Sequence, residues 1–280
     1  MKVLKALPGK HWLAEYDETN AYDWKDAEQY FSWATTGKVN MAHEAIDRHA
    51  EGERANKDAL IYFDGTTEQR FTYADMKRLT NKAANVLVDA GVKTGDRIFI
   101  FMPRSPELYF ALLGALKVGA IVGPLFEAFM EQAVRDRLLD SEAKILVTTK
   151  ALLPRVPVGE LDSLEKVVLV DEGVEESETL IDFRKAFDQA SDVFEPVWLD
   201  REDGLILHYT SGSTGKPKGV LHVQNAMIQH LMTGRWVLDL QEDDVYWCTA
   251  DPGWVTGTSY GIFAPFLNGA TNIVVGGRFN

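Results

Sequence analysis

"DRIFIFMPRSPELYFALLGALKVGAIVGPLF", residues 96–126, is the stretch that decides the fold class. Its first part, "RIFIF", is a short, continuous apolar run that ends near Pro103, which is typical of a strand buried on both faces. "SPELYFALLGALKVGA" predicts a helix with a proline in its first turn, and "IVGPLF" predicts a second buried strand. A strand, a helix and a strand in this order favour parallel strands covered by helices.

The same alternation continues on both sides of this stretch. "FTYADMKRLTNKAANVLVDAG" has apolar residues at helical spacing, a pair resembling a capping box at Thr72 and Asp75, and Gly91 as a stop. "ALIYFDGTTEQRFTY" before it predicts a hairpin that turns at Asp64 and Gly65. "EQAVRDRLLDSEA" predicts a helix, whereas "KILVTT" and "KVVLV" predict strands. We therefore expect an α/β fold of parallel-type sheets flanked by helices, arranged in two sub-domains.

Beyond residue 200 the alternation begins again. "GLILHYT", "GVLHV", "DDVYWCTA" and "ATNIVVGG" predict strands, whereas "QNAMIQHLMTGRWVL" and "SYGIFAPFLNG" predict helices. We divide the chain into an N-terminal arm (1–40), a first α/β sub-domain (41–200) and the start of a second, truncated one (201–280). Because the chain stops just after its last strand, we expect this strand to form an unpaired sheet edge.

Composition narrows the classes of function. The 280 residues are enough for a large hydrophobic core, and the net charge of −13 argues against nucleic acid or an anionic membrane as a partner. The single cysteine, Cys248, excludes a disulfide framework and a cysteine-based zinc site, and it fits a reducing cytoplasm. The N-terminus lacks the sustained apolar core of a signal peptide, and no apolar run reaches the length of a bilayer span.

"LHYTSGSTGKPKGVLH", residues 207–222, combines three glycines, several hydroxyl side chains and two lysines between two predicted strands. Glycines allow close approach of the backbone, whose successive N–H groups can then surround an anion. A flexible surface turn is the simpler interpretation of such a cluster, but this loop is long and doubly basic. The ordinary P-loop is excluded, because Pro217 follows Lys216 and a strand is predicted next. We therefore expect the loop to bind polyphosphate.

"YTSGSTGKPKGV" resembles the phosphate-loop signature of the AMP-forming, adenylate-forming enzymes, and "WCTADPGWVTGTSYGIFAPFLNGAT" resembles a block of their acetyl-CoA synthetases. The resemblance covers nearly all of the chain after residue 38. It implies the large N-terminal domain of these ligases and a two-step reaction. A carboxylate and ATP with Mg²⁺ give an acyl-adenylate and pyrophosphate, and the CoA thiol then displaces AMP. The block favours acetate, with propionate or a medium-chain acid as alternatives.

The resemblance also implies site residues. Trp254, Val255 and Thr256 would line the acyl pocket, although a core position is the simpler interpretation of a tryptophan. Thr210 and Lys218 would stabilise phosphate, and no further catalytic residue or metal ligand is implied within the chain. The ATP phosphates would be held by Thr210, Ser211, Gly212, Ser213, Thr214, Gly215, Lys216 and Lys218. CoA would meet Arg155, Thr256 and Asn280, and Glu127 and Ala128 stand where the family carries glycines.

The family's adenine- and magnesium-binding block, its ribose-binding aspartate and its mobile C-terminal domain lie further along its sequences. Neither a Y-G-x-T-E nor an S-T-G-D string occurs in these 280 residues. We therefore expect this chain to be the N-terminal portion of a longer ligase and not to complete adenylation by itself. A non-catalytic module that binds nucleotide or CoA is the alternative for the isolated chain. The sequence does not indicate an oligomeric state.

Overall fold

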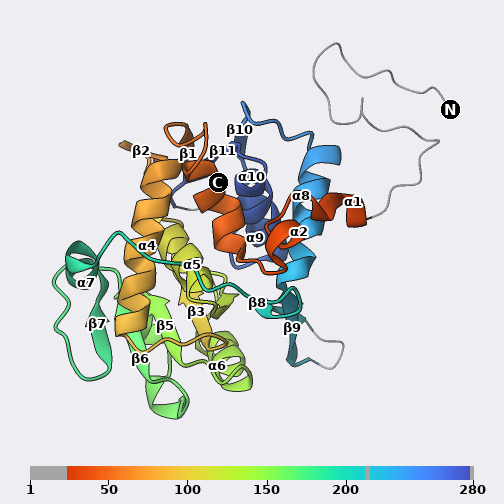
Figure 1. Ribbon diagram of the computed structural model, residues 1–280. Helices are drawn as coiled ribbons and strands as arrows, with labels where there is room; N and C mark the ends of the chain where they lie inside the picture. Colours follow the sequence, from red (N-terminus) through yellow and green to blue (C-terminus); the bar gives the residue numbers. More distant parts are fainter. Residues whose placement is uncertain (1–23, 212–214, 278–280) are drawn as a thin grey trace.

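The computed structural model describes residues 24–211 and 215–277, which form two sheets with helices between and around them (Figure 1). The larger sheet contains β3 (Arg97–Phe101), β4 (Ile121–Pro124), β5 (Ile145–Thr148), β6 (Lys166–Leu169), β7 (Leu180–Asp182), β8 (Gly204–Ser211) and β9 (Pro217–Val223). Its order is β7-β6-β5-β3-β4-β8-β9. The smaller sheet contains β1 (Asp58–Phe63), β2 (Glu68–Thr72), β10 (Val245–Trp247) and β11 (Thr271–Val275), in the order β10-β11-β1-β2.

Most neighbouring strands are parallel, so the predicted α/β class is confirmed. The exceptions are the pairs β1–β2 and β8–β9, which are antiparallel hairpins at one edge of each sheet. The first hairpin turns at the predicted Asp64 and Gly65. There the Asp64 carboxylate accepts the backbone N–H groups of Thr66 and Thr67, each at 2.7 Å. These local bonds explain why the turn could be predicted from its residues.

Strands from the two sides of residue 200 pair with one another. Strand β8 pairs with β4 in the larger sheet, and β11 pairs with β1 in the smaller one, so each sheet contains strands from both sides of that position. The expectation that the last strand forms an unpaired edge is wrong. β11 lies between β10 and β1, and both neighbours are parallel to it. Long-range pairing, which sequence order does not reveal, places β11 inside the sheet.

The longer helices are α4 (Tyr73–Asp89), α5 (Pro106–Lys117), α6 (Glu131–Asp140), α7 (Phe183–Gln189) and α8 (Met227–Trp236). They lie where the alternation predicts them, except α7, which was not predicted from the sequence. Helix α4 begins at a capping box in which Thr72 and Asp75 each accept the other's backbone N–H. The short helices are α1 (Lys25–Glu28), α2 (Trp33–Thr36), α3 (Arg48–Ala50), α9 (Val255–Thr258) and α10 (Ala264–Leu267). π-helical turns occupy η2 (His43–Asp47) and η6 (Ser259–Phe263), and 3₁₀ turns occupy η3 (Leu153–Arg155), η4 (Val158–Glu160) and η5 (Gln224–Ala226).

Helices α4 and α5 form a layer between the two sheets. They pack on each other, α4 contacts β1 and β2, and α5 contacts β3 and β4 (Figure 1). Strand β3 shows why its sequence is apolar without alternation. Ile98 and Ile100 join the core beneath these helices, whereas Phe99 and Phe101 join a second core on the opposite face, with Leu138 of α6. Both faces of β3 are therefore buried, as expected for a central parallel strand.

A buried ion pair fixes this helix layer. Lys117 Nζ lies 2.6 Å from Asp47 Oδ1 and 2.6 Å from Asn81 Oδ1, and it connects α5 to η2 and α4. The Lys117 and Asp47 side chains are 0% and 1% exposed. Burial lowers the pKa of Lys117 and raises that of Asp47, and the attraction between them opposes both changes.

Candidate functional site

The glycine loop joins β8 to β9 at an edge of the larger sheet. In this hairpin Thr210 stands opposite Lys218, and both side chains are exposed, as is Lys216. Gly215 has a φ of +86°, a left-handed conformation that glycine adopts without strain. The structure therefore places Thr210 and Lys218 opposite each other at the base of the loop. Gly212, Ser213, Thr214 and the side chain of Ser211 lie outside the described residues.

The base of the hairpin is attached to α6. The Tyr209 hydroxyl donates a hydrogen bond to Asp140 Oδ2 at 2.7 Å, and the Arg137 guanidinium lies 5.7 Å from the centre of the Tyr209 ring. Burial, followed by the Asp140 carboxylate, raises the pKa of Tyr209 well above its ordinary value, so the phenol keeps its proton. The two strands that carry Thr210 and Lys218 are thus held by a contact with a neighbouring helix.

The segment "DPGWVTG" forms a tight turn that leads into α9. The Asp251 carboxylate accepts the N–H of Gly253 at 2.8 Å, and the Asp251 carbonyl accepts the N–H of Trp254 at 2.9 Å. A Cβ at Gly253 would lie 2.2 Å from the backbone nitrogen of Phe126, and one at Gly257 would lie 1.9 Å from the Asp251 carbonyl oxygen. Close approach of the backbone therefore requires glycine at both positions. At Gly253 the turn packs directly on the segment that follows β4.

Asp251 and Arg104 are residues of this region that sequence reasoning missed. Burial raises the pKa of Asp251 to about 6, although the Gly253 N–H and the Arg104 charge lower it. The Arg104 guanidinium donates to the carbonyls of Thr249 at 3.0 Å and Gly277 at 3.2 Å. The Asp-Pro-Gly sequence could have identified Asp251 as a turn residue. Arg104 had no comparable signal, because its partners are backbone carbonyls far along the chain.

Trp254 is not a core tryptophan, because it is 50% exposed. Its ring centre lies 5.4 Å from that of Phe126 and 6.3 Å from that of Phe129. Val255 and Thr256, which begin α9, are exposed as well. The three predicted pocket residues therefore lie together at the start of a helix, beside two aromatic rings.

Arg155 shares this neighbourhood. Its guanidinium donates to the carbonyls of Glu127 at 3.0 Å and Phe129 at 3.3 Å, so it supports the segment that also contains Ala128. The structure thus connects Arg155 to Trp254 through Phe129. Asn280, the remaining residue predicted to contact CoA, lies outside the described residues.

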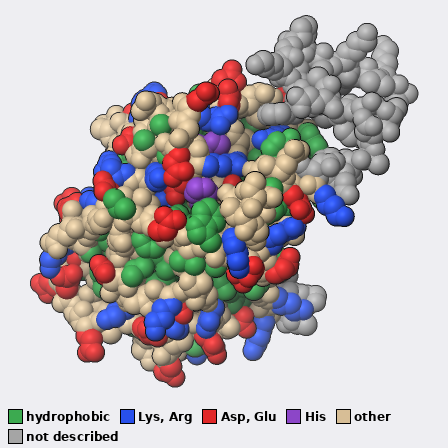
Figure 2. Space-filling model, in the orientation of Figure 1, with side chains coloured by type: hydrophobic (Ala, Val, Ile, Leu, Met, Phe, Trp, Pro, Cys, Tyr) green, Lys and Arg blue, Asp and Glu red, His purple; other side chains and the backbone are tan. Residues whose placement is uncertain are grey.

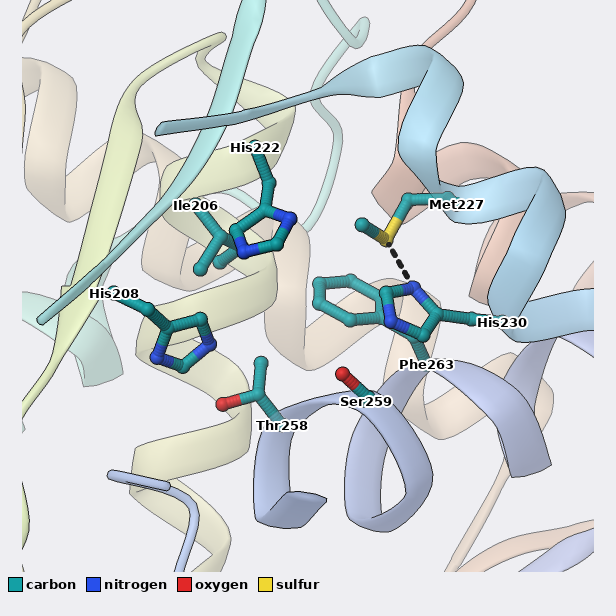
Figure 3. Close-up of a pocket in the computed structure, with 8 residues that line it drawn as sticks. All are labelled: Ile206, His208, His222, Met227, His230, Thr258, Ser259 and Phe263. Carbon is teal, nitrogen blue, oxygen red and sulfur yellow. Dashed lines mark hydrogen bonds between the residues drawn. The ribbon is translucent and has the colours of Figure 1, made fainter. Parts of the chain in front are cut away.

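A small pocket connects the glycine-loop strands to the helix that follows Trp254. His208 on β8, His222 on β9 and His230 on α8 line it, and Thr258 and Ser259 close it from the other side (Figure 3). Its volume of about 10 Å³ is close to the smallest that holds one water molecule. Burial lowers the pKa of His208 and of His230 to about 4, so both rings are neutral near pH 7. The strands of the glycine loop and the helical segment that follows Trp254 therefore meet around a pocket lined by neutral, mostly apolar side chains.

Two absences are established within the described ranges. In residues 24–211 and 215–277, no group of three or more His, Cys, Asp and Glu side chains is arranged to hold a metal ion. Among the same residues, no helix has both the length and the apolar character needed to cross a membrane.

Residues 46–279 match the family model described as AMP-binding enzyme. The chain belongs to this family. The chain is 59% identical to the acetyl-coenzyme A synthetase of Bacillus subtilis, an alignment that covers 100% of this chain and 49% of the relative. It is 38% identical to the acetyl-coenzyme A synthetase of Rubrobacter xylanophilus, over 95% of this chain and 44% of the relative. The resemblance drawn from the glycine loop is thereby confirmed at the level of the family.

Two solved structures resemble this fold. An acyl-CoA synthetase of Brucella canis gives a TM-score of 0.85 at 33% identity and covers 92% of this chain and 47% of its own. An anthranilate CoA ligase in complex with anthranoyl-AMP gives a TM-score of 0.76 at 26% identity, over 86% of this chain and 45% of its own. The chain spans about half the length of the curated relatives that it matches.

Proposed function

We propose that this chain forms the phosphate- and acyl-binding part of an AMP-forming acetyl-CoA synthetase. Such a ligase converts acetate, ATP with Mg²⁺, and CoA to acetyl-CoA, AMP and pyrophosphate through an acetyl-adenylate. The observation that carries the proposal is the exposed pair of Thr210 and Lys218 at the base of the glycine loop, in a chain of the AMP-binding family. The single cysteine supports a cytoplasmic location as part of the proposal.

In the first step, formation of the acetyl-adenylate, the protein contributes by stabilising negative charge rather than by forming a covalent bond to the substrate. An acetate oxygen forms a bond to the α-phosphorus of ATP, and the bond to the bridging oxygen breaks as pyrophosphate leaves. Negative charge therefore accumulates on the β- and γ-phosphates, where fixed donors stabilise it best. The ammonium groups of Lys216 and Lys218, the Thr210 hydroxyl and the backbone N–H groups of the loop are the donors that we assign to this role.

Trp254 is the residue that we assign to limiting the size of the acid. Its ring stands at the N-terminus of α9, backed by Phe126, so an acid bound beside it meets a rigid aromatic wall. Pocket size alone discriminates by about 10- to 200-fold per methylene, which favours acetate over propionate and longer acids. Val255 and Thr256 complete this wall in our proposal. Arg155, which supports residues 127–129, would position the segment near CoA.

The experiment compares ATP and pyrophosphate binding in matched lysine variants. Removing a charged hydrogen-bond donor costs about 1.5–3 kcal/mol, so Lys218→Ala should weaken binding roughly 10- to 100-fold. Lys185→Ala is the control, because Lys185 lies on α7 and pairs with Glu176 at the surface. Equal affinities of the two variants for ATP and pyrophosphate, measured by calorimetry, would refute the assignment.

A second assay separates binding from turnover. Acetate-dependent exchange between ATP and pyrophosphate is measured on the 280-residue chain and, as the positive control, on the Bacillus subtilis relative. We expect the chain to bind ATP without catalysing exchange, whereas the relative should do both. Clear exchange by the chain alone would contradict the prediction that it does not complete adenylation, and the absence of ATP binding would contradict the proposed function.

A further inference from the structure

The proposed reaction assigns no role to Asp251, a buried carboxylate in the turn that precedes Trp254. Charged side chains of both signs are spread over the face of the molecule that Figure 2 shows, whereas Asp251 is 7% exposed. Aspartate is rarely buried unless its carboxylate is paired or hydrogen-bonded. The contacts of this carboxylate therefore indicate what it does.

Asp251 provides two of the hydrogen bonds that fix this turn. Its carboxylate accepts the N–H of Gly253 at 2.8 Å, and its carbonyl accepts the N–H of Trp254 at 2.9 Å. A third bond joins the turn to α9, where the Thr258 hydroxyl donates to the Pro252 carbonyl at 2.6 Å. Of these three acceptors, only the carboxylate can change its charge. It is therefore the acceptor through which pH can alter the turn.

The orientation of the Trp254 ring depends on this turn. Trp254 has an extended backbone, with φ −98° and ψ 151°, and α9 begins directly after it. Its ring is 50% exposed and packs on Phe126 and Phe129, whose ring centres lie 5.4 and 6.3 Å from its own. Gly253 packs so closely on the Phe126 backbone that a Cβ has no room there. A shift of the turn would therefore move the tryptophan ring relative to Phe126.

Charged and titratable side chains interact with Asp251 from three neighbouring segments. They are Arg104, which follows β3, Tyr109 on α5, and Glu127, which follows β4. Burial raises the pKa of Asp251 to about 6 and the charge of Glu127 adds to this rise, whereas the Gly253 N–H and the charge of Arg104 oppose it. Burial also raises the pKa of Tyr109 well above its ordinary value, so the phenol keeps its proton. Asp251 therefore changes its charge in a pH range in which an ordinary aspartate is almost fully ionised.

We propose that the Asp251 carboxylate positions Trp254: while it is ionised it holds the turn and keeps the ring against Phe126, and its protonation releases the ring. A carboxylate accepts an N–H more strongly than the neutral acid does, so protonation weakens the bond to Gly253. This role rests on the proposed function, in which Trp254 limits the size of the acid. Discrimination between acetate and propionate should therefore decline at mildly acidic pH, because the aromatic wall is then less rigid.

Fluorine NMR of the chain labelled with 5-fluorotryptophan tests the link between Asp251 and Trp254 without any ligand. The chain contains seven tryptophans, and the variant Trp254→Phe identifies the resonance of Trp254. In the unaltered chain this resonance should shift as the pH is lowered, with a midpoint that matches the Asp251 pKa of about 6. Asp251→Asn keeps an oxygen that accepts the Gly253 N–H, so it should hold the resonance at its high-pH position and abolish the titration. Asp251→Ala removes the acceptor and should displace the resonance at every pH.

Asp64 provides the matched control, because its carboxylate also accepts backbone N–H groups in a turn, those of Thr66 and Thr67. Asp64→Asn and Asp64→Ala should leave the Trp254 resonance and its titration unchanged. A Trp254 resonance that is independent of pH in the unaltered chain, or one that still titrates in Asp251→Asn, would overturn the proposal. So would an Asp251→Ala resonance that coincides with that of the unaltered chain. None of these readings requires ATP to bind the glycine loop, so their failure is distinguishable from a failure of the proposed function.

Discussion

Replacing Lys117 by methionine tests the buried ion pair most directly. Methionine keeps an unbranched apolar side chain and removes the ammonium group, so the Asp47 carboxylate stays 1% exposed without its cation. Asn81 loses the same partner, since Lys117 Nζ donates to its Oδ1 at 2.6 Å. The substitution therefore leaves both a charge and an amide oxygen unsatisfied in the core.

The size of the expected loss in unfolding free energy follows from this burial. Breaking a buried pair by removing one partner costs about 3–5 kcal/mol, a large share of the roughly 5–15 kcal/mol that stabilise a typical domain. Replacing both partners by apolar side chains of similar volume is often nearly neutral. We therefore expect Lys117→Met and Asp47→Asn to be strongly destabilising, and Lys117→Met/Asp47→Leu to recover most of the loss. Lys77→Met is the control, because its pair with Glu51 is partly exposed and such pairs contribute about 0–1 kcal/mol.

The assay is urea unfolding followed by circular dichroism, with the free energies combined in a double-mutant cycle. The pH dependence gives a second check. Without Lys117, the largest effect that opposes burial is lost and only the charges of His43 and Lys77 still lower the pKa of Asp47, so this pKa rises further in the folded state. The deficit relative to the unsubstituted chain should therefore be small below about pH 4 and grow as the pH rises. A cost of Lys117→Met no larger than that of Lys77→Met, or a double variant as unstable as the sum of the singles, would refute the reasoning.

Three further predictions concern the candidate site. Gly253→Ala should cost about 1–3 kcal/mol in urea unfolding, because the added Cβ would meet the backbone of Phe126, which cannot move aside as a side chain can; an unchanged midpoint would contradict this. His208 and His230 have pKa values of about 4 in the folded state and about 6.5 in the unfolded state. Each histidine therefore contributes up to about 3 kcal/mol to the free energy of unfolding, and this contribution is present above pH 6.5 and lost as the pH falls toward 4. His208→Phe should flatten the plot of unfolding free energy against pH in that window, and an unaltered slope would refute the assignment. Trp254→Ala should cost less than the roughly 3–5 kcal/mol of a core tryptophan, because the ring is 50% exposed, and a larger loss in the same unfolding assay would show that the residue is structural.

Features that depend on neighbouring residues were predicted correctly. The apolar run of β3, the capping box of α4 and the turn at Asp64 and Gly65 each arise from contacts within a few residues. The glycine loop and the "DPGWVTG" segment were found for the same reason, since each motif is one continuous stretch of backbone. The comparisons confirm the family that these motifs indicated.

The sequence by itself determined the α/β class, most elements and the two motifs of the candidate site, because periodicity and turn chemistry act locally. Only the tertiary structure decided which strands pair, and it placed β11 inside its sheet. It also buried Lys117 against Asp47, 70 residues away, and brought Phe126 beside Trp254. Such contacts depend on packing between segments that are distant in the chain, and no local pattern of residue types specifies them.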